Sequence, residues 1–313
     1  MAMIEVRDVV KRYGASVAVG GVSFDVDRGE ILGFLGPNGA GKSTTMKIIT
    51  NFIAPDEGAV RVAGHDIFAE PLQARRRIGY LPENTPLYLE MGVVEFLEYV
   101  CDLRGLRGRR RRQRLGEMID VCGLAPEITK VIGELSKGYR QRVGLAQAMI
   151  HDPDVLILDE PTSGLDPNQI ADIRALIREI GREKTILLST HILPEVTTTC
   201  TRALIISRGR IAGSGTPDEL QRRASGGSLF VTARGPKEAM RAALCEIQDV
   251  SDVVVASEPG AGRVRFALKV AAGADPGESV FQLMAARGWP LSELRYEAAS
   301  LEDVFRQLTT GEA

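Results

Sequence analysis

The alternation of apolar and polar residues divides the chain into strands and helices. Residues 4–6 and 22–26 alternate between apolar and polar side chains, which is typical of half-buried antiparallel strands. Residues 31–35 and 155–158 form continuous apolar runs, and the second run suits a central parallel strand that is covered on both faces. Apolar residues at helical spacing predict helices over 93–103 and 115–122, with no strand between them. We therefore expect an α/β domain that carries a helical insertion.

Further elements follow from the same pattern. They are strands at 59–63 and 185–190, helices at 44–49, 143–150 and 173–180, and a hairpin formed by 203–207 and 210–212. Composition then changes near residues 222–228, a stretch rich in Arg, Ser and Gly that is typical of a linker.

The order of elements beyond residue 228 predicts a second, smaller domain. It runs strand 229–233, helix 237–244, strands 250–256 and 264–270, helix 278–287 and strand 291–296, with a last helix at 301–308. This order is that of a ferredoxin-like split βαβ fold. We predict a large domain at 1–222 with a helical subdomain at about 86–150, a linker at 223–228, and an α+β domain at 229–313.

Composition adds limits to this picture. A chain of 313 residues is long for one domain and suits one large and one smaller domain. The balance of 39 basic against 41 acidic residues gives no reason to expect a nucleic-acid partner. No apolar run approaches the ~20 residues that cross a bilayer, and residues 1–5 lack the character of a signal peptide. The four cysteines (101, 122, 200 and 245) show no C-x-x-C spacing, and we expect free thiols in the cytosol.

The strongest chemical signal is a phosphate-binding loop. Residues 36–44 fit the pattern G-x-x-x-x-G-K-[ST], between a predicted strand and a predicted helix. A glycine-rich turn with a stray lysine is the alternative, and the two flanking elements argue against it. Backbone N–H groups of such a loop surround a polyphosphate, Lys42 neutralises the β- and γ-phosphates, and the Ser43 hydroxyl holds Mg²⁺. The expected ATP-binding residues here are Gly36, Asn38, Gly39, Gly41, Lys42, Ser43 and Thr44.

A second group of polar residues follows two apolar strands. Asp159 and Glu160 end the run at 155–158, where a carboxylate beside a phosphate loop holds Mg²⁺ and the next residue orients or deprotonates the attacking water. His191 follows the strand at 185–190, and the chemistry alone leaves its role open between a site residue and an ordinary histidine.

These motifs together resemble the ATPase subunit of ATP-binding-cassette (ABC) transporters, over about residues 3–220. Residues 135–142 are similar to the family signature, and residues 163–166 are similar to its D-loop. The resemblance implies that His191 contacts the γ-phosphate and that Tyr13 stacks on adenine. It also implies that Ser136, Gly138 and Asp166 contribute to ATP binding.

Two departures distinguish this chain from the usual family pattern. Lys137 and Tyr139 replace a glycine and a glutamine of the signature, while Ser136 and Gly138 keep the hydroxyl and the bare backbone N–H. Glu83 stands where the family has a glutamine at the Mg²⁺ site, and its carboxylate remains an oxygen ligand suited to Mg²⁺. Both variations, and the tail at 300–305, resemble subunits of ABC-2-type exporters, including the gliding-motility and copper-enzyme-maturation branches.

The resemblance implies a mechanism and a location. Two copies would sandwich two ATP molecules head to tail, each site combining residues of both copies, and would drive an ABC-2-type transmembrane permease from the cytoplasmic face of the membrane. The alternative is a soluble ABC-type ATPase that acts on a ribosome or DNA. One cassette and no long heptad segment favour the exporter.

An arginine run at 104–114 contains seven arginines and no acidic residue. Contact with anionic lipid and contact with nucleic acid are possible functions of such a run. Because it lacks interleaved aromatic residues, we interpret it as a solvated helix face or connection.

Overall fold

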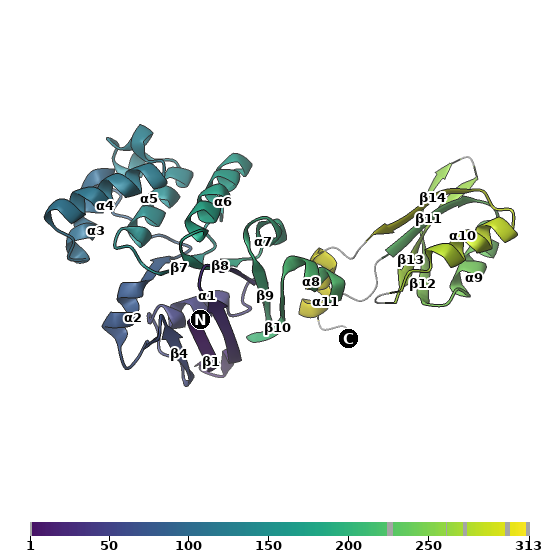
Figure 1. The fold of residues 1–313 in the computed structure, drawn as a ribbon, viewed down its shortest axis with the longest axis horizontal. Coiled ribbons are helices and arrows are strands. Elements are labelled where there is room, and N and C mark those ends of the chain that lie inside the picture. The colour runs from purple at the N-terminus through teal and green to yellow at the C-terminus, as the bar shows by residue number, and fades with distance from the viewer. Residues whose placement is uncertain (1, 224–227, 261, 272–273, 298–300, 311–313) are drawn as a thin grey trace. The chain divides into compact units, whose positions relative to one another are not determined.

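The computed structural model describes residues 2–223, 228–260, 262–271, 274–297 and 301–310 (Figure 1). The chain forms two compact units, Met1–Ser214 and Gly215–Ala313. The first unit contains two sheets and a group of helices, and it carries the predicted site.

An antiparallel sheet opens the first unit. It has the order β2-β1-β4-β5, with β1 at Ala2–Tyr13, β2 at Ser16–Asp27, β4 at Glu57–Val62 and β5 at His65–Asp66. Ile4 and Val6 are buried while Glu5 between them is half-buried, so the alternation predicted from the sequence faces a core on one side.

The second sheet has the order β10-β9-β3-β8-β7-β6. Its strands are β3 (Ile31–Leu35), β6 (Ile78–Leu81), β7 (Val155–Asp159), β8 (Thr185–Thr190), β9 (Arg202–Ser207) and β10 (Arg210–Gly215). The pairs of β3 with β8 and β9, and of β7 with β6 and β8, are parallel. Every residue of β3, β7 and β8 is buried, as the continuous apolar runs predict.

Helices cover this sheet. Helix α1 (Lys42–Ile49) contacts β2, β4 and β7, and its buried Met46, Ile48 and Ile49 share one hydrophobic core with both sheets. Helix α6 (Pro167–Gly181) packs on α7 (Leu193–Thr199), which contacts β3 and β8. Parallel strands end at the same edge of a sheet, so the loops after β3, β7 and β8 meet at one place.

The helical insertion consists of α3 (Val93–Leu103), α4 (Gly108–Val121) and α5 (Lys137–Met149), which contact one another. Two short 3₁₀ helices, Ala125–Glu127 and Ile132–Glu134, lie between α4 and α5, and α2 (Pro71–Arg77) precedes β6. The arginines from position 109 onward lie within α4, so most of the arginine run is helical. Within the described ranges, no helix combines the length and the apolar character that crossing a membrane requires.

The second unit contains the predicted α+β fold. Its antiparallel sheet has the order β12-β13-β11-β14. The elements are α8 (Pro217–Arg223), β11 (Ser228–Arg234), α9 (Lys237–Cys245), β12 (Val250–Gly260), β13 (Arg263–Val270), α10 (Gly277–Ala286), β14 (Leu291–Glu297) and α11 (Leu301–Thr310). The first and last of the four strands pair with each other, which is the arrangement of a ferredoxin-like fold.

The division between the two units falls at 214/215, earlier than the predicted end of the large domain at residue 222. Helix α8 contacts α11 and belongs to the second unit. Of the predicted linker at 223–228, residues 224–227 lie outside the described residues, Arg223 ends α8 and Ser228 begins β11. The predicted tail motif begins at Ser300, which is also outside the described residues, and α11 begins one residue later.

Candidate functional site

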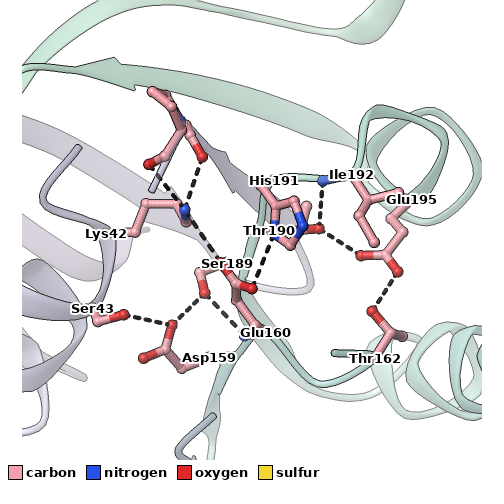
Figure 2. Close-up of polar contacts among 12 residues, drawn as sticks. Lys42, Ser43, Asp159, Glu160, Thr162, Ser189, Thr190, His191, Ile192 and Glu195 are labelled. Atoms are coloured by element: carbon pink, nitrogen blue, oxygen red, sulfur yellow. Dashed lines mark hydrogen bonds and ion pairs between the residues drawn. The ribbon is translucent and has the colours of Figure 1, made fainter. Parts of the chain in front are cut away.

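The carboxyl ends of three parallel strands bring the predicted catalytic residues together (Figure 2). The loop after β3 leads into α1, whose first two residues are Lys42 and Ser43. Asp159 ends β7 and Glu160 follows it, and His191 follows β8. The site therefore depends on strand pairing between segments more than 100 residues apart.

Glycine residues allow the phosphate-binding loop at 36–44 to turn tightly. Gly39 and Gly41 have φ of 78° and 104°, a region that favours glycine. A Cβ on Gly41 would stand 2.4 Å from the Ala18 carbonyl oxygen, and one on Gly36 would stand 2.5 Å from the Ile206 carbonyl oxygen. Both positions therefore require glycine for space, and helix α1 begins immediately after Gly41 with its free N–H groups at the site.

Lys42 is buried, with its side chain 5 % exposed, and its ammonium group lies inside the loop. Its Nζ donates to the carbonyl oxygens of Gly36 at 2.8 Å and Pro37 at 3.2 Å, and it lies 3.2 Å from Oε1 of Glu160. A cation enclosed by backbone oxygens and one carboxylate is suited to bind a phosphate group that enters the loop.

Ser43 and Asp159 supply hard oxygen donors close together. Ser43 Oγ donates to Asp159 Oδ1 at 3.2 Å, and Ser189 Oγ donates to the same carboxylate oxygen. No group of three or more histidine, cysteine or acidic side chains in the described part of the chain is arranged to hold a metal ion. This donor set fits Mg²⁺, which proteins usually hold through one or two carboxylates together with substrate phosphates and water.

Glu160 and His191 form a pair at the edge of the site. Nδ1 of His191 lies 3.0 Å from Oε2 of Glu160, while Lys42 contacts the other carboxylate oxygen. Glu160 has φ of 47°, an uncommon value for a residue with a side chain, and its N–H donates to Ser189 Oγ at 3.0 Å. A strained backbone held by a neighbouring strand is often found at functional positions.

Most of the predicted site residues line one pocket with a volume of about 570 Å³. Glu83 lines it with an exposed side chain, and Tyr13, which is 53 % exposed, lines it as the predicted adenine contact. The lining residues are Tyr13, Ala18, Asn38, Gly39, Gly41, Lys42, Ser43, Thr44, Glu83, Glu160, Ser163 and His191. A pocket of this size with a cation, two carboxylates and bare backbone N–H groups suits a nucleotide.

Five predicted site residues lie outside this lining. Gly36 begins the phosphate loop and Asp159 contacts Ser43, whereas Ser136, Gly138 and Asp166 lie at helix N-termini. Ser136 precedes α5 and its Oγ accepts from the N–H of Tyr139 at 3.3 Å. Gly138 packs so closely against Gln169 that a Cβ would stand 2.8 Å from that side chain. Asp166 precedes α6 and accepts from the N–H groups of Asn168 and Gln169, so its carboxylate has a structural role as a helix cap.

Sequence patterns did not reveal two polar residues, Ser189 and Glu195, that hydrogen-bond the site residues or their neighbours in sequence. Ser189 bridges Asp159 and the N–H of Glu160, while Glu195 accepts hydrogen bonds from Thr162 and Thr190. Ser189 lies inside an apolar strand and Glu195 in a short helix, so neither belongs to a motif of its own. The pairing of β7 with β8 places Ser189 beside Asp159, and the hydrogen bonds of Glu195 to Thr162 and Thr190 place Glu195 behind the two loops.

The parallel sheet, the phosphate loop and the paired Glu160 and His191 define the class of P-loop ATPases. Comparison with known proteins gives the family: an ABC transporter model matches residues 19–163, and a second model, described as an AAA domain, putative AbiEii toxin, Type IV TA system, matches residues 131–197. The chain is 33 % identical over 97 % of its length to the ABC transporter ATP-binding protein YxlF of Bacillus subtilis (strain 168), of which it covers 98 %. The chain therefore belongs to the ATP-binding subunits of ABC transporters, and it is an ATP-binding ATPase.

Other relatives carry names that describe export or resistance. The Nod factor export ATP-binding protein I of Burkholderia orbicola (strain AU 1054) is 33 % identical, with 99 % of this chain and 97 % of the relative covered. The daunorubicin resistance ATP-binding protein DrrA3 of Streptomyces coeruleorubidus is 38 % identical, with 74 % and 73 % covered.

Solved structures support the fold. An ATP-binding subunit of an ABC transporter matches with a TM-score of 0.64 and 34 % identity, covering 71 % of this chain and 92 % of that chain. The dimeric structure of MJ0796, a bacterial ABC transporter cassette, matches with a TM-score of 0.62 and 26 % identity, covering 68 % and 98 %. The predicted P-loop ATPase fold is thus confirmed.

Proposed function

We propose that this chain is the ATPase subunit of an ABC-2-type membrane exporter, and that two copies pair head to tail around ATP. The observation that carries the proposal is the division of the site. Lys42, Glu160 and His191 line one pocket, whereas the signature residues Ser136 and Gly138 lie at the N-terminus of α5, outside its lining. A second copy, turned head to tail, would bring that helix N-terminus to the γ-phosphate.

The residues of one copy have distinct roles in this proposal. Lys42 binds the β- and γ-phosphates, and Tyr13 stacks on the adenine. Ser43 and Asp159 would hold Mg²⁺, with Glu83 lining the same pocket, and a bound Mg²⁺ would supply positive charge to the phosphates. Glu160 accepts a proton from the attacking water, and His191 keeps its carboxylate aimed at the γ-phosphate. Asp166 acts by fixing the start of α6 next to the second copy.

Pairing around ATP gives the chain a mechanical cycle. Neither half of the site surrounds the γ-phosphate alone, so ATP stabilises the pair, and hydrolysis removes that stabilisation. A membrane permease on the cytoplasmic face can convert the closing and opening into transport. The names of relatives that export Nod factor or confer daunorubicin resistance support an exporter over a soluble ATPase that acts on a ribosome or DNA.

The test is a pull-down in the native host with Glu160→Gln, which we expect to trap ATP, and with Lys42→Ala as the control that cannot hold it. We expect the trapped variant to recover a polytopic membrane protein in near-equal amount when ATP and Mg²⁺ are present, and the control to recover less. Recovery of only ribosomes, nucleic acid or soluble proteins would refute the exporter and leave the ATPase chemistry unaffected.

A further inference from the structure

Glu195 is a buried carboxylate that the proposed reaction does not use. It lies on α7, and only 1 % of the residue is exposed to solvent. A carboxylate in such surroundings is costly to bury unless charged and hydrogen-bonding partners surround it. The identity of its partners therefore indicates what the residue holds in place.

Both oxygens of the Glu195 carboxylate are used (Figure 2). Thr162 Oγ1 donates to Oε1, and Thr190 Oγ1 donates to Oε2 at 2.6 Å. Arg174 on α6 adds a positive charge, with its Nη2 3.7 Å from Oε1. The carboxylate thus connects three separate segments of the first unit.

Each of the two threonines lies within two residues of Glu160 or His191 in sequence. Thr162 comes two residues after Glu160, and Thr190 comes directly before His191. Thr190 Oγ1 also accepts from the N–H of Ile192 at 3.0 Å, so its hydroxyl fixes the backbone on both sides of His191. One buried group therefore sets the distance between the two loops whose side chains meet at 3.0 Å.

We propose that Glu195 is a positioning residue for ATP hydrolysis. It holds Thr162 and Thr190 at one carboxylate and thereby keeps the pair of Glu160 and His191 in its reactive arrangement. The inference rests on the roles proposed above for Glu160 and His191. Because nucleotide binding depends on the loop at 36–44, loss of Glu195 acts on turnover more than on affinity.

The experiment uses the purified full chain and compares Glu195→Ala, Glu195→Gln, Thr190→Val and Thr190→Ser. Thr199→Val is the matched control, since Thr199 is also buried on α7 and its side chain hydrogen-bonds Thr198 instead of the catalytic loops. For each variant we measure kcat and KM for ATP, the equilibrium affinity for a fluorescent ATP analogue, and the melting temperature.

We expect Glu195→Ala to lower kcat by about 10- to 100-fold, the scale of a small misplacement of catalytic groups, with much smaller changes in KM and affinity. Glu195→Gln keeps one acceptor oxygen, so its kcat should lie between those of Glu195→Ala and the parent. Thr190→Val lowers kcat, Thr190→Ser restores most of it, and combining Thr190→Val with Glu195→Ala adds little to the single change. The control keeps the parent kcat.

Several results would overturn the proposal. The first is a Glu195→Ala variant that folds and keeps the parent kcat. The second is a kcat that falls only in proportion to the fraction of Glu195→Ala molecules that are folded. Equal kcat for Thr190→Val and Thr190→Ser is a third. Should Glu195→Ala fail to fold, the comparison of Thr190→Val with Thr190→Ser decides. In those two variants the Glu195 carboxylate keeps its contacts with Thr162 and Arg174. Failure of the catalytic assignment itself is separate and shows as turnover by Glu160→Gln.

Discussion

At the scale of single residues, the contacts of Glu160 lead to a clear expectation. Glu160→Gln keeps the size of the side chain and its reach to Lys42 and His191 but removes the proton acceptor. We expect kcat for ATP hydrolysis to fall by about 10²-fold or more while ATP affinity is kept. Glu57→Gln, an exposed change on β4 where Glu57 pairs with Arg12, is the control and should keep the parent rate. Hydrolysis at the parent rate by Glu160→Gln would exclude Glu160 as the base.

The two glycines of the phosphate loop give a second residue-level prediction, because they differ in the space around them. Alanine at either position adopts an unfavourable φ, at a cost of about 1–2 kcal/mol. A Cβ at Gly39 meets nothing within 4 Å, whereas one at Gly41 meets the Ala18 carbonyl at 2.4 Å. Chemical denaturation should therefore show that Gly41→Ala destabilises the chain clearly more than Gly39→Ala. Equal losses of stability in the two variants would mean that the unfavourable φ alone, and not the contact with Ala18, sets the cost of alanine.

The sequence predicted those site residues that belong to a contiguous motif. The phosphate loop, Asp159, Glu160 and His191 each follow a recognisable apolar strand, and the structure brings them to one sheet edge. Glu195 and Ser189 could not be predicted in the same way. Their roles depend on hydrogen bonds between segments that only the folded sheet brings together, and neither spacing nor composition indicates those bonds.

At the scale of elements, α4 begins with charges of the unfavourable sign. Its first turn contains Arg109, Arg110 and Arg111 and no acidic residue, although the N-terminus of a helix carries a partial positive charge. Arg111 is compensated by ion pairs with Glu98 and Asp102, while Arg109 is exposed. We expect Arg109→Glu to stabilise the protein by about 0.3–1 kcal/mol at low salt, and Arg109→Gln by less. Denaturation at low and high salt measures this, and a stabilisation that persists in high salt would contradict the electrostatic cause.

The elements that the sequence did not predict are short. Strand β6 has four residues including a glycine, and α7 has seven residues including three threonines, which are poor helix formers. Helix α2 buries only Ala74, so it has no apolar face to detect. Tertiary contacts form these elements: β6 pairs with β7, and α7 packs on β3 and β8. Longer segments such as α3 and β8, with a full apolar pattern, were predicted with their observed bounds.

At the scale of the whole molecule, the sequence predicted a large and a smaller domain. It placed the end of the large domain at residue 222, whereas the structure divides after Ser214. The contacts of α8 with α11 assign residues 215–223 to the second unit, and these contacts link the start of that unit to its last helix. Local composition marked only the change at residues 222–228. Helix α8 belongs to the second unit because it packs on α11, about 80 residues later in the chain, and local sequence does not indicate that contact.

Acid stability of the first unit depends on a buried histidine that no motif includes. His151 follows α5, and its Nε2 lies 3.0 Å from the Ile78 carbonyl oxygen, to which it can donate when neutral. Burial, together with the positive charge of Arg104, lowers the pKa of His151 from 6.5 to about 4. Between pH 6.5 and 4 the unfolded chain binds a proton at His151 that the folded chain does not bind. The free energy of unfolding is therefore undiminished by this group above pH 6.5 and falls as the pH drops towards 4. The loss from this group is at most about 3 kcal/mol.

The variant His151→Gln tests this account, because glutamine can still donate to the Ile78 carbonyl and does not titrate. We expect it to be less sensitive to acid than the parent between pH 6.5 and 4. Tryptophan fluorescence would report on the wrong unit, since the single tryptophan is Trp289. Native-state hydrogen exchange of β6 and β7 reports on the first unit directly. Identical pH dependence in the parent and His151→Gln would show that acid acts through other groups.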